Sequence, residues 1–325
     1  MIKFFRSNLL VSIFTALPVI AIVLWISAFF EPPIITTNYS MPLFDFINKY
    51  IGQISFLQTF VALVGTYLQG LLLNRIVNRD QLLNQRSKLV ALLFVVLMSC
   101  LQPLLSLHPV LFVNLFLILA LHRIGSMYLQ QNIFSQAFDA GIFIGLASLF
   151  YLPSIIFFPF ILTSILIIRP FNWREHLIAL LGLCVPFAFI YTYFFYFDGL
   201  NYFWNEKILH PIHQQTQHIS NFKSLDYFLV FSLLILLILS IMKIANTLNN
   251  SIVKTQSLLL SLLSFFGFAV LTVVLVGTSS IYAYTFLAIP FSIFLANYFL
   301  TMKENWLAEI IFGALLIFIL YQHFF

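Results

Sequence analysis

The segment FDAGIFIGLASLFYLPS, residues 138–154, places one acid, Asp139, at the start of an apolar run that is rich in small residues. Gly141, Gly145 and Ser148 follow one another at spacings of four and three residues, so they fall on one face of an α-helix. A face of small residues lets the backbone of a neighbouring helix approach closely. Asp139 lies off this face. The segment therefore predicts a tightly packed helix inside a helical bundle, with a carboxylate near its start.

The composition indicates that this bundle lies in a membrane. Of 325 residues, 62% are hydrophobic and only 8% are charged, which leaves too little polar surface for a water-soluble protein of this length. The apolar runs are continuous and do not alternate, which excludes a transmembrane β-barrel and favours helices that satisfy their own backbone hydrogen bonds. We predict an all-α polytopic membrane protein in which residues 1–325 form a single helical domain.

The apolar runs predict about eleven transmembrane helices, since each run approaches the roughly 17 to 25 residues that cross a bilayer. The predicted spans are Leu9–Phe30, Phe56–Leu73, Leu89–Leu105, Pro109–Leu121, Ala140–Leu152, Ser154–Ile168, Leu177–Phe197, Tyr227–Met242, Leu258–Val276, Tyr282–Leu300 and Leu307–Tyr321. Pro109–Leu121 and Ala140–Leu152 are short for full spans, so the count allows for half-inserted segments.

Basic residues predict the orientation of these spans, because cytoplasmic loops retain Lys and Arg. Twelve of the fifteen basic residues, including every arginine, fall in one set of alternate connections. The other set holds only Lys49, Lys207 and Lys223. We therefore expect the amino terminus inside, and an odd number of spans then places the carboxyl terminus outside. The net charge of +5 reflects this topology, and nucleic-acid binding is not expected.

Two predicted external loops, residues 31–53 and 198–226, exceed hairpin length and hold the candidate site. The first contains Glu31 and, in the hydrophobic turn LFDFI, Asp45. Either carboxylate can act as a general base if burial tunes its pKa, and the alternative is a solvated loop acid. The second contains Lys207 with a histidine cluster, which suits a lipid phosphate or, less well, a divalent cation, and the alternative is ordinary interfacial polarity. The cluster comprises His210, His213 and His218.

Two stretches carry a resemblance to a known family. They are HRIGSMYLQQNIFSQAFDAGIFIGLASLFYLPSIIFFPF, residues 122–160, and RPFNWREHLIALLGLCVPFAFIYTYFFYF, residues 169–197. Together they resemble multi-pass inner-membrane proteins of the Bacteroidota that share a domain of unknown function. The resemblance implies a protein of the bacterial inner (cytoplasmic) membrane, and it implies no activity.

A more distant likeness, through the GIFIGLA helix and the RPFNWRE turn, is to the GT-C superfamily of polyprenyl-phosphate-dependent glycosyltransferases. This likeness implies that the catalytic carboxylate lies in the first external loop, where the chain offers Glu31 and Asp45. The chain departs from that superfamily in having neither an adjacent Asp-Glu pair nor a large external domain.

Three functions follow as hypotheses. The first is a GT-C-like membrane protein that takes a sugar from a polyprenyl-phosphate lipid and transfers it to an external acceptor. Asp45 is then slightly favoured over Glu31 as general base, while Lys207 and the histidine cluster meet the donor phosphate, with or without a divalent cation. The alternative is a non-catalytic scaffold that assembles with another membrane protein in envelope biogenesis. A transporter is third.

The sequence also predicts structural contacts within the bundle. Arg123 ends the span that precedes Asp139, so we expect an Arg123–Asp139 ion pair to close this helical hairpin. A proton relay through Asp139 is the alternative, because acids near membrane spans are often functional. Gly141 and Gly145 are assigned to helix packing. The two cysteines lie in apolar runs and are predicted to be buried: Cys100 and Cys184.

Overall fold

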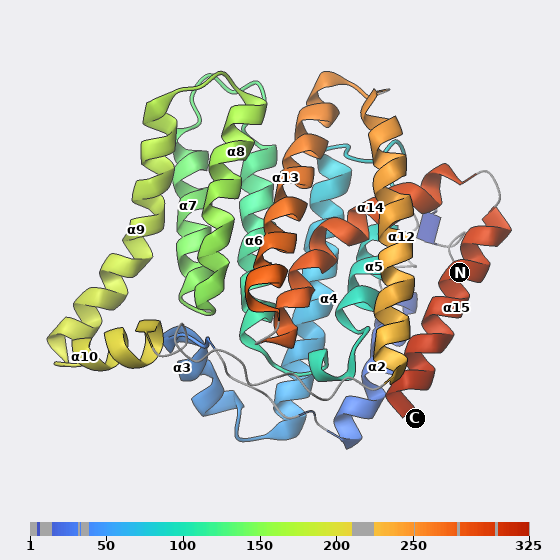
Figure 1. Cartoon of the computed structure of the whole chain (residues 1–325), viewed down its shortest axis with the longest axis horizontal. Helices are drawn as coiled ribbons and strands as arrows, with labels where there is room; N and C mark the ends of the chain where they lie inside the picture. Colours follow the sequence, from blue (N-terminus) through green and yellow to red (C-terminus); the bar gives the residue numbers. More distant parts are fainter. Residues whose placement is uncertain are drawn as a thin grey trace.

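The computed structural model describes residues 5–6, 15–31, 33, 39–209, 224–249, 251–277, 280–302 and 305–324. Within these residues the regular structure is helical apart from one isolated antiparallel bridge between Ser40 and Tyr151, which confirms the all-α prediction (Figure 1). The elements in chain order are α2 (Leu17–Phe30), α3 (Pro42–Ile51), α4 (Ser55–Arg79), α5 (Leu89–Met98), η2 (Gln102–Leu104), α6 (Pro109–Gly125), α7 (Phe134–Ser148), η3 (Leu152–Phe157), α8 (Phe158–Ile168), α9 (Trp173–Tyr196), α10 (Leu200–Tyr202), η4 (Phe203–Leu209), α12 (Ser224–Asn249), α13 (Val253–Val276), η5 (Ile281–Leu287), α14 (Ala288–Thr301) and α15 (Asn305–Phe324). Of the elements labelled η, η4 is a π-helix and the others are 3₁₀-helices.

Six of these helical segments are long and apolar enough to cross a membrane, as in a multi-pass membrane protein. They are α4, α9, α12, α13, the continuous η5–α14 segment and α15. Each coincides with one of the predicted spans. The other five predicted spans correspond to the shorter helices α2, α5, α6, α7 and α8. By length and composition, the described part of the chain therefore supports six full spans and does not establish eleven.

Helix α7 differs from the predicted span Ala140–Leu152, because it begins six residues earlier and ends four residues earlier. The residues after it leave the helix to pair with the extended segment before α3, where the Met41 N–H donates to the Phe150 carbonyl oxygen at 3.2 Å. Pro153 then lies in the first turn of η3, so the chain restarts as a 3₁₀-helix that continues into α8. Long-range backbone pairing ends α7, and hydropathy carries no signal for it.

Glycines of both helices bring α7 and α9 into direct backbone contact. A Cβ atom built on Gly141 would lie 2.1 Å from the Ala179 carbonyl oxygen, and one built on Gly145 would lie 2.7 Å from a carbonyl oxygen of α9. A Cβ on Gly182 of α9 would lie 2.2 Å from a carbonyl oxygen of α7. Side chains larger than hydrogen do not fit at such distances, so this helix pair depends on glycine at all three positions.

The far half of α9 leans away from the bundle (Figure 1), and Pro186 lies inside this helix. Proline removes a backbone donor and clashes with the preceding turn, so it is an ordinary cause of helix bending. Beyond this point the side chains of Phe189 and Tyr196 are exposed. The lean carries α10 and η4 outward, to the end of the bundle where α3 lies (Figure 1).

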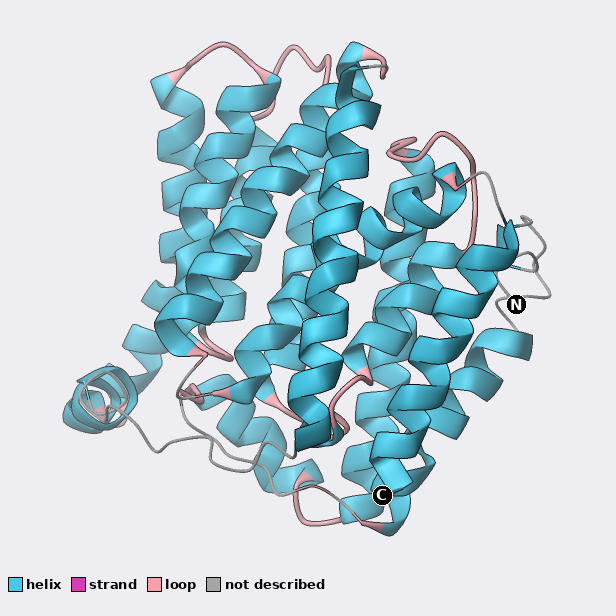
Figure 2. Cartoon of the chain, turned by 45° about the vertical axis from the view of Figure 1, so that its right-hand side comes forward, coloured by secondary structure: helices cyan, strands magenta, loops and turns pink. Residues whose placement is uncertain are grey.

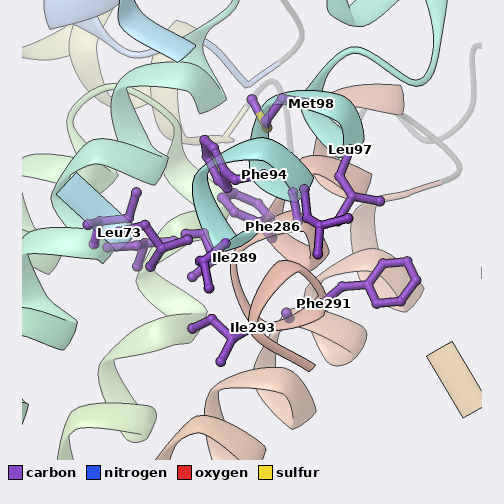
Figure 3. Packing of buried hydrophobic residues seen from close by; sticks show 14 of the residues in the cluster. Leu73, Phe94, Leu97, Met98, Phe286, Ile289, Phe291 and Ile293 are labelled. Carbon is purple, nitrogen blue, oxygen red and sulfur yellow. The ribbon is translucent and has the colours of Figure 1, made fainter. Parts of the chain in front are cut away.

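The core is centred on α5, whose ten residues are all buried. Figure 3 shows Phe94, Leu97 and Met98 of α5 packed with Phe286 of η5 and Ile289 of α14. The surrounding helices shield α5 from any solvent, water or lipid. This explains how a helix too short to span a bilayer is accommodated among longer ones.

The two ends of the bundle carry different charged groups. Figure 2 shows the connecting loops gathered at opposite ends of the helical body. One end, which we call the arginine end, is drawn at the top of Figure 1 and holds Arg79, Arg123 and Arg169 near the ends of α4, α6 and α8. The opposite end, which we call the α3 end, holds α3, α10 and η4, with Asp45 and Lys207.

Candidate functional site

Asp45 lies in the first turn of helix α3, so the predicted hydrophobic turn LFDFI is wrong. Pro42 begins this helix, because its fixed φ suits the first helical position and its missing N–H is not needed there. A carboxylate in the first turn is also favoured by the helix dipole. Of the two flanking phenylalanines, Phe44 is fully buried and Phe46 is 64% exposed. Asp45 therefore lies at the boundary between the core and the surface.

Lys207 and Ser40 hold the Asp45 carboxylate. The Lys207 ammonium forms an ion pair with Oδ2, and the Ser40 hydroxyl donates a hydrogen bond of 2.9 Å to Oδ1. The Lys207 Nζ also lies 3.5 Å from the Ser40 carbonyl oxygen. The Asp45 side chain is 40% exposed and that of Lys207 is 14% exposed. The carboxylate thus keeps an accessible face, while the ammonium is largely covered.

The π-helix η4 positions Lys207. Phe203, at the start of η4, packs in a small hydrophobic cluster with Met41 and Leu149. This cluster fixes η4 against the segment that precedes α3. π-helical turns are uncommon and occur frequently at functional sites. The two segments that sequence analysis treated as separate external loops are therefore joined at one place.

The chain enters α3 through a constrained backbone. Tyr39 has a φ of 62°, in the left-handed region that non-glycine residues rarely occupy. Next to it, Ser40 pairs with Tyr151 as an antiparallel bridge, and the rings of Tyr39 and Tyr151 meet edge to face at 6.0 Å. These contacts tie the start of α3 to the start of η3, so the position of Asp45 is set by the bundle.

Glu31 occupies a separate position at the α3 end. It follows α2 directly, it is exposed, and its N–H donates to the Ser27 carbonyl oxygen at 2.9 Å. Helix α2 is anchored by a buried hydrogen bond of 2.8 Å from the Trp25 indole N–H to the Ser99 hydroxyl. Among the described contacts, none joins Glu31 to Asp45. The structure thus brings Asp45 and Lys207 together and leaves Glu31 apart from them.

The predicted histidine cluster of His210, His213 and His218 lies outside the described residues, so its contact with a phosphate stays a prediction. Within the described part of the chain, no group of three His, Cys, Asp or Glu side chains is arranged to hold a metal ion. A divalent cation at this site stays a prediction that depends on these three histidines.

At the arginine end, the Arg123 Nη2 lies 3.1 Å from the Asp139 Oδ2 and so joins α6 to α7. The two side chains are 41% and 28% exposed, which is typical of an ion pair near the surface. Two further pairs at the same end escaped the sequence analysis: Arg79–Asp80 at 2.9 Å and Arg169–Glu175 at 3.7 Å. The second pair has a visible signal, because both of its residues lie within the compact RPFNWRE turn.

Sequence reasoning also missed a buried histidine at the start of α6. The His108 ring stacks on Tyr282 with centroids 4.7 Å apart, and its Nδ1 accepts a hydrogen bond of 3.2 Å from the Leu111 N–H. An accepting Nδ1 places the proton of a neutral imidazole on Nε2, which has no hydrogen-bond partner among the residues that the structure describes. The polar residue before Pro109 was the available signal, since it marks a helix start.

A family model described as a family of unknown function (DUF6427) matches residues 27–325. The chain belongs to the DUF6427 family. The match includes α3, η4 and the α7–α9 pair, so the Asp45–Lys207 contact and the glycine contact both lie within the family region. No curated protein and no solved structure matches the chain.

Proposed function

We propose that this chain is a GT-C-like membrane protein that takes a sugar from a polyprenyl-phosphate lipid and transfers it to an acceptor at the α3 end. The observation that supports the proposal is the ion pair between Asp45 and Lys207, which are 162 residues apart in the chain. Their contact supplies a carboxylate and an ammonium group at one end of a membrane bundle. When a hydroxyl group displaces phosphate, a carboxylate can take the hydroxyl proton and an ammonium group can stabilise the negative charge of the leaving phosphate.

The proposed orientation places the arginine end in the cytoplasm and the α3 end outside. It is supported by Arg79, Arg123 and Arg169 at one end, because cytoplasmic connections retain arginine. The shorter helices then act as membrane-embedded segments beside the six long ones, for about eleven in all. The test is labelling of single cysteines by an impermeant maleimide in intact cells. Asp198→Cys should react and Arg79→Cys should not, and the reverse pattern would exclude this orientation.

In the proposed reaction, a hydroxyl oxygen of the acceptor forms a bond to the anomeric carbon of the donor sugar. The bond from that carbon to the phosphate oxygen breaks, and the phosphate leaves with the electron pair. The accessible face of the Asp45 carboxylate takes the proton of the acceptor hydroxyl. An ammonium group has three N–H donors, so Lys207 can bond to Asp45 and to the leaving phosphate at the same time. Glu31 is the second candidate for the base.

The experiment uses the purified full-length protein in vesicles, with polyprenyl-phosphate-linked labelled sugars and envelope acceptors. Loss of a general base commonly lowers a rate by about 10²- to 10⁴-fold, so Asp45→Asn should lose nearly all transfer. Asp198→Asn is the matched control, because it removes another exposed carboxylate near the end of α9. Full transfer by the Asp45→Asn, Glu31→Gln double variant would exclude the mechanism. Absence of transfer by the wild type with every donor would exclude the function.

The second candidate function is a non-catalytic scaffold that assembles with another membrane protein. It is favoured by the ion pair and hydrogen bonds among Asp45, Lys207 and Ser40, because these contacts would also hold α3 and η4 together in a protein without catalytic activity. Under this alternative, Asp45→Asn lowers the unfolding temperature, and crosslinking in native membranes captures the same partner protein repeatedly. Transfer activity in the purified protein would exclude a purely structural role.

A further inference from the structure

A cavity of about 410 Å³ lies between α5, α12, α13 and the η5–α14 segment. Its volume falls in the range of roughly 300–1,000 Å³ that is usual for small-molecule sites. Leucine, valine, phenylalanine and alanine side chains make up most of its wall, and the side chains with polar or sulfur atoms are Cys100, Tyr227 and Tyr284. Water finds few hydrogen-bond partners in such a space, so the cavity suits a hydrocarbon ligand.

The cavity opens sideways, toward the surface that faces lipid. Tyr227 and Leu234 of α12 and Val270 of α13 line it, and these residues are 65%, 50% and 37% exposed. Both helices are long and apolar enough to span a membrane, so their outer surfaces meet hydrocarbon. They lie close at the arginine end and diverge toward the α3 end (Figure 1). A ligand that enters between them comes from the bilayer.

The height of the cavity matches one leaflet. Its wall on α12 runs from Tyr227 to Leu237, whose positions are ten helical steps apart, or about 15 Å along the helix, which is half of a hydrocarbon core of about 30 Å. Tyr227 lies in the first turn of α12 and Tyr284 lies on η5, both toward the α3 end. A wall that is apolar along one leaflet, with phenol groups toward one end, suits a chain whose polar head lies at the α3 end.

Two acids lie toward the α3 end of this wall: Asp226 directly precedes the lining residue Tyr227 on α12, and Glu31 directly follows α2. Cys100 lines the cavity, and the residue before it, Ser99, receives the hydrogen bond from Trp25 of α2. Glu31 follows Trp25 by six residues, so it lies about 9 Å further along the direction of α2, toward the α3 end. A lipid with its chain in the cavity would therefore present its head at the α3 end of the bundle.

We propose that this cavity holds the hydrocarbon chain of a lipid from the leaflet at the α3 end. The identity of the chain rests on the proposed function: a polyprenyl-phosphate donor would place its isoprenoid chain here, with its phosphate toward the α3 end. A phospholipid would place an acyl chain in the same cavity. Both chains share the chemistry that the wall recognises, and both enter between α12 and α13.

The test is photocrosslinking of the full-length protein in vesicles with two diazirine probes, a polyprenyl phosphate and a phosphatidylglycerol labelled in its acyl chain. Leu234→Trp fills the cavity, while Ile235→Trp is its matched control. The two wild-type side chains are similarly exposed, at 50% and 45%, but only Leu234 lines the cavity. We expect labelled peptides from α5, α12 and α13 in the wild type and in Ile235→Trp, and a several-fold loss of label in Leu234→Trp. Thermal unfolding of both variants shows that each is folded.

The outcomes separate this inference from the proposed function. Labelling by the polyprenyl probe supports an isoprenoid chain in the cavity, and labelling by the acyl probe alone supports a phospholipid chain there. Equal labelling of the two tryptophan variants, or label confined to helices outside the cavity, would overturn the inference. If Leu234→Trp loses the label but still transfers sugar, the proposed function remains supported. The donor chain then does not bind in this cavity.

Discussion

Replacing Gly141 with alanine should destabilise the protein, because the added methyl group clashes with α9 and forces α7 and α9 apart. The new Cβ atom would lie 2.1 Å from the Ala179 carbonyl oxygen, whereas ordinary contacts begin near 3.4 Å. The helices must therefore separate by more than 1 Å, because the obstacle is backbone and cannot rotate aside. Gaps of this size forfeit a quarter to a half of the dispersion energy of each contact across the interface. Overpacking commonly costs about 1–3 kcal/mol, and we expect a loss in this range.

Gly313 of α15 is the matched control. It also lies within a helix, but a Cβ atom built there meets nothing within 4 Å. Alanine is favoured over glycine in helix interiors by about 1 kcal/mol, so Gly313→Ala should leave stability unchanged or raise it. The same chemical change is thus expected to act with opposite signs at the two positions.

The assay is the unfolding temperature of the purified protein in detergent, followed by tryptophan fluorescence and by the fraction that remains monodisperse. A loss of about 1–3 kcal/mol corresponds to a decrease of several degrees for a chain of this size. Gly182→Ala should behave like Gly141→Ala, since it enters the same interface from the other helix. An unfolding temperature for Gly141→Ala at or above that of the wild type would refute the close backbone contact.

Three further predictions follow from individual contacts. Gly145→Leu should reduce the yield of folded protein more than Asp139→Asn does, because overpacking costs about 1–3 kcal/mol and a partly exposed ion pair contributes below about 1 kcal/mol. Comparable yields of the two variants would contradict this order. Normal folding with lost activity in Asp139→Asn would favour a proton relay through Asp139. A double-mutant cycle of Asp45→Asn and Lys207→Met should give a favourable coupling free energy of about 0.2–1 kcal/mol in chemical unfolding, and strictly additive effects would show that the two groups do not interact. Trp25→Phe should lower stability by about 1 kcal/mol through loss of its buried indole hydrogen bond, and an unchanged unfolding temperature would argue against that bond.

The candidate site shows where prediction from sequence stops. The sequence identifies Asp45 and Lys207 as charged residues of two separate segments, but it carries no sign that they meet. Their contact depends on the pairing of residues near Met41 with the end of α7 and on the packing of Phe203 in the same cluster. The Met41–Phe150 pairing and the packing of Phe203 with Met41 each join segments more than a hundred residues apart. The local sequence does not show which distant segments come into contact, so the Asp45–Lys207 pair is visible only in the folded chain.

The cysteines illustrate the same limit for burial. Cys100 is buried, as predicted, but Cys184 is exposed on α9, and the prediction for it was wrong. Both lie in apolar runs, and in a membrane protein an apolar residue is stable either in the core or against lipid. Hydropathy therefore does not tell which face of a spanning helix is covered by protein. The face is chosen by the neighbouring helices.

The sequence by itself determined that this chain is a helical membrane protein, because the preference of a long apolar segment for hydrocarbon is a sum over its own residues and requires no partner. It also marked the small-residue face of α7, since the spacing of Gly141 and Gly145 is a local property. Tertiary structure alone decided that α9 covers this face, through Gly182, and that α12 and α13 diverge and help to enclose a cavity. Those features depend on which helices are neighbours and at what angle they cross, and this is settled by packing among segments distant in the chain.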